Sequence, residues 1–215
     1  MKHVQETDDG FVSLWPTKLL KRMLPDAQAA NKELARLIEE LDNAHRDLTT
    51  DYRSDNLFTL DDAAVAWLRE CVNITVGDYF RHLEMNYDIH WSLQALANVN
   101  RFTDYHDYHN HPHAYLSGTY YVRIPSELEK LETRKDSRPG RLTLYDPRAC
   151  ANMTAIKGDP YIEPEYTVAP EAGMIVLWPA FVNHFVHPNL SKQPRLSVSF
   201  NVLLKWSEDY LPTQL

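Results

Sequence analysis

The sequence predicts a mainly β protein, a jelly roll or sandwich whose N-terminal helices pack on one sheet. Three observations support this. The chain has 215 residues with 44% hydrophobic and 24% charged residues, which is typical of one globular domain. Ten of its 13 prolines lie between Pro112 and Pro194, whereas none lies between Asp26 and Tyr87. Beyond Asp88 the hydrophobic pattern has a period of two. We therefore expect a single domain over 1–215, with residues 1–87 as a mostly helical buttress and 88–215 as the β core.

Two helices are predicted in the proline-free stretch, where long helices are permitted. The first runs from Ala30 for about five turns, because its apolar residues follow the spacing of one buried stripe. The second begins near Thr59, where a hydroxyl and the carboxylates of Asp61 and Asp62 suit the positive end of a helix, and continues to Leu83. The stripe of the first helix consists of Leu34, Leu37, Ile38 and Leu41.

Seven short strands are predicted in the remainder of the chain. Residues 195–203 and 115–124 alternate between two sets of side chains, as a strand with two different faces does. Proline and glycine separate the other segments at spacings typical of turns. The predicted strands are 91–99, 115–124, 141–145, 161–168, 174–178, 185–187 and 195–203.

The polar face of the last strand carries Arg195, Ser197, Ser199 and Asn201. Two interpretations are open. An edge strand would turn this face toward water, whereas a strand inside a barrel would turn it toward a pocket.

Four of the ten histidines, His106, His109, His111 and His113, lie within eight residues. In an extended strand, residues i and i+2 point the same way, so His109 and His111 can present two imidazoles to one metal ion. Imidazole suits Fe, Zn, Cu or Ni, and a third ligand on a neighbouring strand would leave open coordination positions. His184, at the start of a predicted strand, is the main candidate for that ligand.

Other pairings stay open from the residues alone. His187 is a competing third ligand. Asp104 and His106 have the same i, i+2 spacing and would supply a carboxylate. His106 and His113 are otherwise expected to be hydrogen-bonded or solvent-facing, and a role without metal is an alternative for His109 and His111.

Charge and composition exclude several classes of protein. Twenty-two basic residues against thirty acidic ones give a net charge of −8, so we expect no nucleic-acid partner. No run of eighteen apolar residues or secretory signal is present, so we expect a cytoplasmic protein without a membrane partner. Cys71 and Cys150 are expected to be unpaired thiols.

Five segments and His184 together resemble the 2-oxoglutarate/Fe(II)-dependent oxygenase superfamily. The resemblance is to a group of about 200-residue bacterial and phage oxygenases with a His-x-His-Pro motif. It covers about half of the chain and implies a double-stranded β-helix, a cupin-like jelly roll. The segments are 109–112, 116–122, 142–148, 173–179 and 195–201.

The resemblance also implies roles for individual residues. His109, His111 and His184 would bind Fe(II), and Arg195 would bind the distal carboxylate of 2-oxoglutarate with help from Ser197. A guanidinium suits a carboxylate, which agrees with that role. Two further residues would contact the co-substrate, namely Asn98 and Tyr121.

The expected reaction is the hydroxylation of a small molecule or peptide with O2. One departure from the superfamily is that His111 stands where an aspartate or glutamate is usual. A three-histidine cupin-like dioxygenase that does not use 2-oxoglutarate is therefore one alternative, and a non-catalytic ligand-binding jelly roll is another. Asp146 and Arg148 form either an ion pair that fixes a loop or a substrate contact. A homodimer is compatible with the sequence.

Overall fold

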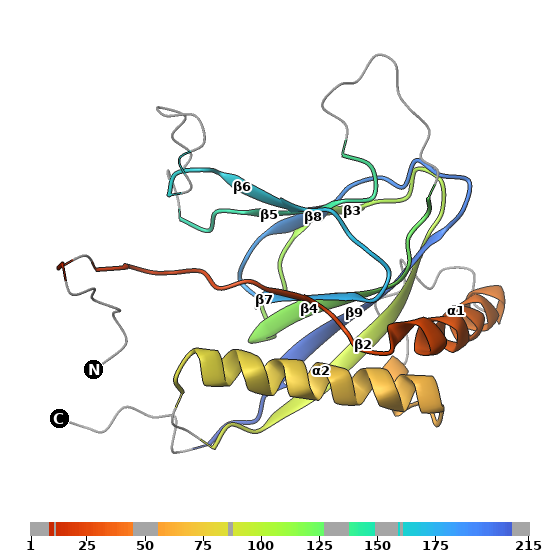
Figure 1. The fold of residues 1–215 in the computed structure, drawn as a ribbon, viewed down its shortest axis with the longest axis horizontal. Helices are drawn as coiled ribbons and strands as arrows, with labels where there is room; N and C mark the ends of the chain where they lie inside the picture. Colours follow the sequence, from red (N-terminus) through yellow and green to blue (C-terminus); the bar gives the residue numbers. More distant parts are fainter. Residues whose placement is uncertain are drawn as a thin grey trace, which may run out of the picture.

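Two antiparallel sheets face each other in the structure, a computed structural model that describes residues 9–10, 12–44, 56–85, 88–126, 138–148, 159 and 161–207 (Figure 1). The larger sheet has the strand order β1-β7-β4-β9-β2, and the smaller has the order β3-β8-β5-β6. The larger contains β1 (Leu20–Met23), β7 (Met174–Pro179), β4 (Leu116–Arg123), β9 (Arg195–Leu204) and β2 (Trp91–Asn100). The smaller contains β3 (His106–His109), β8 (His184–Val186), β5 (Leu142–Tyr145) and β6 (Glu165–Val168).

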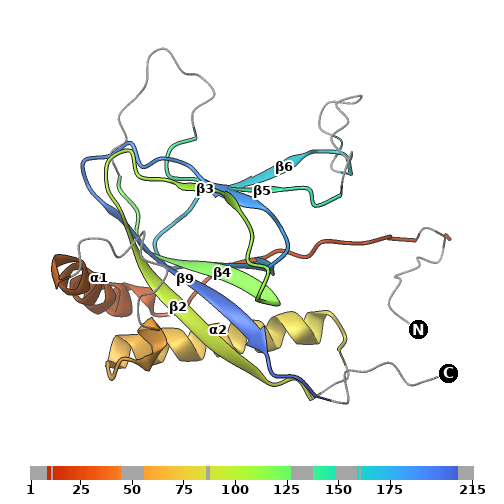
Figure 2. The ribbon, with the colours of Figure 1, turned by 180° about the vertical axis from the view of Figure 1, so that it is seen from behind.

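Helices α1 (Ala27–Ala44) and α2 (Ala63–His82) cover the face of the larger sheet that points away from the smaller one (Figure 2). A short 3₁₀ helix, η1 (Leu57–Thr59), precedes α2. The cap of α2 is the carboxylate of Asp62, which accepts hydrogen bonds from the backbone N–H groups of Ala64 and Val65. The Thr59 hydroxyl, predicted as a cap, instead donates to the carbonyl of Asn56. In the described part of the chain, the helices are too short or too polar to span a bilayer.

The two faces of the larger sheet differ in chemistry because its strands alternate. On β9, Leu196 and Val198 pack against the helices in the main core, together with Phe200 and Val202. The side chains on the opposite face of β9 include those of Arg195 and Ser197, which are also buried. Since no helix covers that side, these polar residues face the smaller sheet. The pocket-lining interpretation of this strand is therefore correct, and the solvent-facing one is wrong.

The predicted mainly β architecture with helices on one sheet is confirmed. Six predicted strands agree with observed ones to within one residue at each end, whereas the predicted strand 161–168 begins only at Glu165 because the residues before it form turns. Strands β1 and β3 were not predicted. Cys71 is a free thiol, as expected, and Cys150 lies outside the described residues.

Gly118 in β4 lies where the sheet has no room for a side chain. A Cβ atom at this position would overlap the ring of Phe200 and would lie 2.6 Å from the carbonyl oxygen of Val176. That oxygen belongs to the neighbouring strand β7 and cannot move without disturbing the ladder. We expect Gly118→Ala to lower the free energy of unfolding by about 1–3 kcal/mol, measured by urea denaturation.

Gly77 in α2 provides the matched control. A Cβ atom at Gly77 would meet no atom within 4 Å, and the helix gains from alanine. Gly77→Ala should therefore raise the free energy of unfolding by about 0.5–1 kcal/mol. Equal stability of the two variants would contradict the close packing of β4 against β7 and β9.

Candidate metal centre and its cavity

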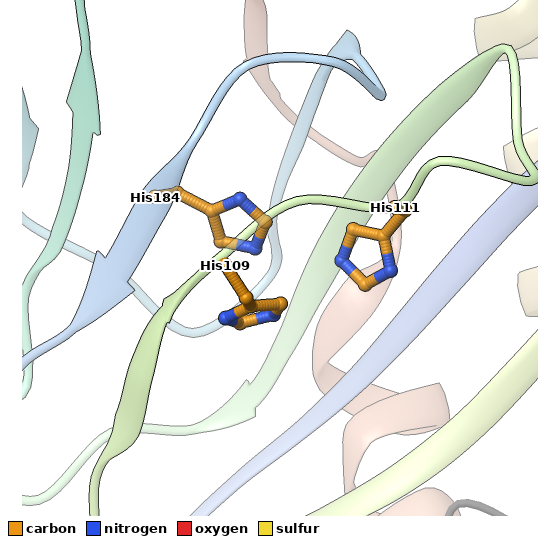
Figure 3. A group of neighbouring side chains, drawn as sticks. All are labelled: His109, His111 and His184. Carbon is orange, nitrogen blue, oxygen red and sulfur yellow. The ribbon is translucent and has the colours of Figure 1, made fainter.

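Three histidine rings converge at one end of the smaller sheet (Figure 3). His109 in β3 and His184 in β8 are direct cross-strand partners, so their side chains share a face. Their ring centroids are 4.2 Å apart, and the ring of His111 lies 5.1 Å from His109 and 5.2 Å from His184. One nitrogen from each ring lies within 4.8 Å of the other two.

His111 reaches this cluster by a different route from the one predicted. Strand β3 ends at His109, so the two histidines do not share an extended strand. Instead, the backbone N–H of His111 donates to the carbonyl of Ala180, 3.0 Å away, in the connection between β7 and β8. This bond holds the turn after β3 against the segment that leads to His184.

Backbone carbonyls orient two of the rings. Nδ1 of His109 is 2.5 Å from the carbonyl oxygen of Asp107, and Nδ1 of His184 is 3.1 Å from that of Val182. A carbonyl can only accept, so each Nδ1 carries the proton and donates it. Each Nε2 is then left with a lone pair, which is the arrangement of a histidine that ligates through Nε2.

Two rings of the cluster, those of His184 and His111, are neutral near pH 7. Burial lowers the pKa of His184 to about 3, and the neighbouring rings add to this effect. Burial, followed by the proximity of His109, lowers the pKa of His111 to about 4. A metal ion binds the unprotonated imidazole, so these rings need not lose a proton before they bind one.

A cavity of about 210 Å³ extends from the three histidines between the two sheets. Most of the residues that line it are of polar types, but none of the described ones carries a carboxylate. Arg195 is the one residue with a permanent charge among the described lining residues. The lining includes Gln94, Leu96, Asn98, His106, His109, His111, Ser117, Thr119, Tyr121, Leu142, Trp178, His184, Val186, Arg195, Ser197, Ser199 and Asn201.

Arg195 is buried without a counterion among the described residues. Its side chain is at the start of β9 and only 3% of the residue is exposed. One terminal nitrogen donates to the carbonyl of Gly140 at 3.0 Å and the other donates to Oδ1 of Asn100 at 2.7 Å, while Nε has no partner. A buried guanidinium is costly unless an anion neutralises it. Its place in the cavity wall is suited to a carboxylate ligand.

Asn98, Ser197 and Tyr121 lie side by side next to Arg195. They form one row across strands β2, β9 and β4, since Ser197 is the register partner of both Asn98 and Tyr121. Nδ2 of Asn98 already donates to Oγ of Ser199 at 2.9 Å. Burial raises the pKa of Tyr121 to about 12, so its hydroxyl keeps its proton and can donate. The structure thus brings all four predicted co-substrate residues to one wall of the cavity.

Unpartnered buried nitrogen atoms gather at this cavity. In the described part of the chain, five buried side-chain polar atoms lack a hydrogen-bond partner, and four belong to cavity residues or to Asn100, which contacts Arg195. The four atoms are Arg195 Nε, His106 Nε2, Trp178 Nε1 and Asn100 Nδ2. Because buried polar atoms normally have partners, these nitrogen atoms suit a bound molecule with several acceptors.

The alternative ligands from the sequence do not join the cluster. Nε2 of His187 is 2.8 Å from Oγ1 of Thr143, and the side chain of Asp104 accepts from the backbone N–H of Arg101. His113 is exposed, as expected. His106 departs from the expectation, because its Nε2 is neither hydrogen-bonded nor solvent-facing.

Asp146 and Arg148 form an ion pair, with Nη2 of Arg148 2.6 Å from Oδ2 of Asp146. Nη2 of Arg148 also donates to the carbonyl of Tyr161 at 2.7 Å. These contacts join the beginning of the β5–β6 connection to its later part, so of the two roles left open by the sequence the structure favours the loop-fixing one.

The donor set fits a first-row transition metal. Three imidazoles, from β3, the turn that follows it and β8, bind such ions, and three protein ligands leave positions free for other molecules. Arg195, whose Nε has no partner, lines the same cavity. Both features fit an iron ion together with an acidic small molecule.

Comparisons with known proteins agree with this chemistry. A family model described as "Putative 2OG-Fe(II) oxygenase" matches residues 94–201, half of the 215-residue chain. The matched segment contains His109, His111, His184 and Arg195. No curated protein matches the chain in sequence.

Several solved structures share the fold. A prolyl-4-hydroxylase from Pseudomonas putida is 15% identical, with 86% of this chain and 87% of that chain covered and a TM-score of 0.56. A prolyl hydroxylase from Trichoplax adhaerens, in complex with a hypoxia inducible factor peptide fragment, is 13% identical, with 86% and 83% covered and a TM-score of 0.60. AviO1 from Streptomyces viridochromogenes is 12% identical, with 92% and 93% covered and a TM-score of 0.53.

Proposed function

Because the chain belongs to the 2OG-Fe(II) oxygenase family, we propose that it is a mononuclear non-haem Fe(II)- and 2-oxoglutarate-dependent dioxygenase. Family membership makes it an oxidoreductase whose cofactor is Fe(II) and whose co-substrates are 2-oxoglutarate and O2. The substrate hydroxylated in the reaction is a small molecule or a peptide. The two sheets form a double-stranded β-helix, and residues 1–215 form a single domain.

His109, His111 and His184 would hold the iron, His109 and His184 through Nε2. The carbonyls of Asp107 and Val182 orient the rings of His109 and His184 by binding Nδ1, which leaves Nε2 of each ring as the ligating atom. When bound, Fe(II) supplies the oxidation in which 2-oxoglutarate and O2 yield succinate, CO2 and a hydroxylated substrate. The protein supplies the ligands, the orientation of the co-substrate and a cavity from which water is displaced.

The proposal that the co-substrate is a diacid rests on Arg195. It is buried in the same cavity as the histidines, and no described carboxylate pairs with it. A distal carboxylate would neutralise the guanidinium and accept from its unpartnered Nε. Ser197 and Tyr121 can donate hydroxyl hydrogen bonds to the same carboxylate, and Asn98 can contact the co-substrate from β2.

The three-histidine ligand set leaves the metal with one more positive charge than two histidines and a carboxylate would. Three-histidine dioxygenases that do not use 2-oxoglutarate are the second candidate function, and His111 is the observation that favours them. Such an enzyme has no need for a buried Arg195 in the cavity, so we favour the 2-oxoglutarate-dependent reaction.

A peptide or small molecule fits the proposed reaction as substrate. The structurally similar Trichoplax adhaerens enzyme is in complex with a peptide fragment. The exposed side chain of Gln94 and the half-buried side chains of Ser199 and Asn201 line this cavity on strands β2 and β9. Neutral amides and a hydroxyl can hydrogen-bond a polar group of the substrate beside the metal.

Anaerobic titration with Fe(II) and then 2-oxoglutarate tests the proposed function. We expect one equivalent of iron to bind, followed by a weak visible metal-to-ligand charge-transfer band when 2-oxoglutarate is added. Iron binding without the band would favour the three-histidine alternative, and absence of both would leave a non-catalytic binding protein. A screen of metabolites and peptides for succinate production then identifies the substrate.

A further inference from the structure

His106 is a cavity residue that the proposed reaction does not yet use. Its side chain lines the cavity, and its buried Nε2 has no hydrogen-bond partner. An unsatisfied buried donor or acceptor destabilises the folded protein, so a partner from within the cavity would relieve that cost. Since none of the described residues supplies that partner, a bound molecule is the natural source.

A β-bulge explains why His106 faces the cavity. His106 pairs with Val186, and His109 pairs with His184. The step of three residues from His106 to His109 in β3 therefore lies opposite a step of only two residues in β8. In a regular strand, residues i and i+3 point to opposite faces. The extra residue in the bulge turns His106 to the same face as His109, as bulges beside active sites do elsewhere.

The register places His106 between the metal ligands and Arg195. Two rows of residues cross the smaller sheet about 6.6 Å apart along the strands, and a third row lies just beyond the end of β8 and the start of β5. The first row contains two of the metal ligands, the second contains His106, and the carbonyl in the third accepts from Arg195. The rows are His109, His184 and Leu144; then His106, Val186 and Leu142; then Pro188 and Gly140.

Residues at both ends of the cavity affect the pKa of His106. Burial is the largest cause that lowers the pKa of His106 to about 4, and the charge of Arg195 is the next, ahead of His109 and His111. Among the neighbouring residues, Arg195 therefore lowers the pKa of His106 the most. The ring is neutral near pH 7 and can donate one hydrogen bond from Nε2.

We propose that His106 is a co-substrate-binding residue, whose Nε2–H donates a hydrogen bond to the distal carboxylate that Arg195 also holds. This inference rests on the proposed function, because it assumes that the cavity binds 2-oxoglutarate. Strand β3 would then have two functions, because His109 binds iron and His106 binds the diacid. The smaller sheet would then bind the distal carboxylate together with Arg195 of the larger sheet.

Three variants test this role. His106→Leu removes the donor, and His106→Gln restores an amide N–H on a side chain of similar length. His113→Leu is the control, since His113 is exposed in the same segment. We expect His106→Leu to weaken anaerobic binding of 2-oxoglutarate about tenfold or more, as loss of a hydrogen bond to a charged group does. His106→Gln should recover most of the affinity, and all three variants should retain one equivalent of iron.

A second ligand separates this contact from a structural role. 2-Oxopentanoate has the same chelating end as 2-oxoglutarate but lacks the distal carboxylate. His106→Leu should leave its affinity unchanged, whereas a distorted cavity would weaken both ligands equally. Unchanged binding of 2-oxoglutarate in His106→Leu, or equal losses for both ligands, would overturn the assignment. If the wild-type protein binds iron but not 2-oxoglutarate, the proposed function itself fails instead.

Discussion

Replacing His184 by alanine is expected to abolish iron retention. Its ring is buried, lies 4.2 Å from that of His109, and has its Nε2 lone pair freed by the bond from Nδ1 to the carbonyl of Val182. Loss of an outer partner of a metal ligand alone weakens metal binding by about 10- to 100-fold, so loss of the ligand should exceed that range. Elemental analysis after gel filtration should find about one iron per wild-type chain and close to none in His184→Ala.

Two other histidines serve as controls for this result. His113→Ala removes an exposed ring two residues after His111, and His187→Ala removes a ring whose Nε2 is bonded to Thr143. Both should retain iron. If His113→Ala or His187→Ala lost the metal while His184→Ala kept it, the ligand set would be wrong.

Replacing Arg195 by methionine should greatly raise the concentration of 2-oxoglutarate needed for binding, with iron still in place. Methionine approximates the length of the side chain but carries no charge. Removing one partner of a buried charged pair costs about 2–5 kcal/mol, which corresponds to a loss of roughly 30-fold or more in affinity. Anaerobic titration of the iron-loaded protein measures this loss, and elemental analysis verifies the iron content.

Arg123 offers a matched control near the same end of the larger sheet. It forms an ion pair with Glu39 of α1 at 2.7 Å, on the face away from the cavity. Arg123→Met should leave the affinity for 2-oxoglutarate unchanged. Identical 2-oxoglutarate titrations for wild type and Arg195→Met would show that the buried guanidinium does not hold the diacid.

Much of the fold could be predicted because most strands are long or clearly patterned. Strands β4 and β9 alternate over eight and ten residues, with helices on one side and the cavity on the other. The missed strand β1 has only four residues, and its Lys21 and Arg22 break the apolar pattern. It is a strand because it pairs with β7 at the edge of the sheet, a tertiary contact that local periodicity does not reveal.

The candidate site was predictable to a similar extent. The spacing of His109 and His111 indicated a metal site, although His111 reaches it from a turn rather than from the strand. His106 was expected to be hydrogen-bonded or solvent-facing, and in a regular strand its three-residue spacing from His109 would place it on the opposite face. The bulge between His106 and His109 reverses that face, and only the pairing of β3 with β8 makes the bulge visible.

Anomalous diffraction from a crystal grown anaerobically with Fe(II) tests the central claim most directly. Data collected on both sides of the iron absorption edge locate the metal without reference to any assumed ligand. We predict one iron peak bonded to Nε2 of His109, His111 and His184, with the remaining coordination positions open toward the Arg195 cavity. An iron peak elsewhere, or rings turned apart around an empty centre, would contradict the account.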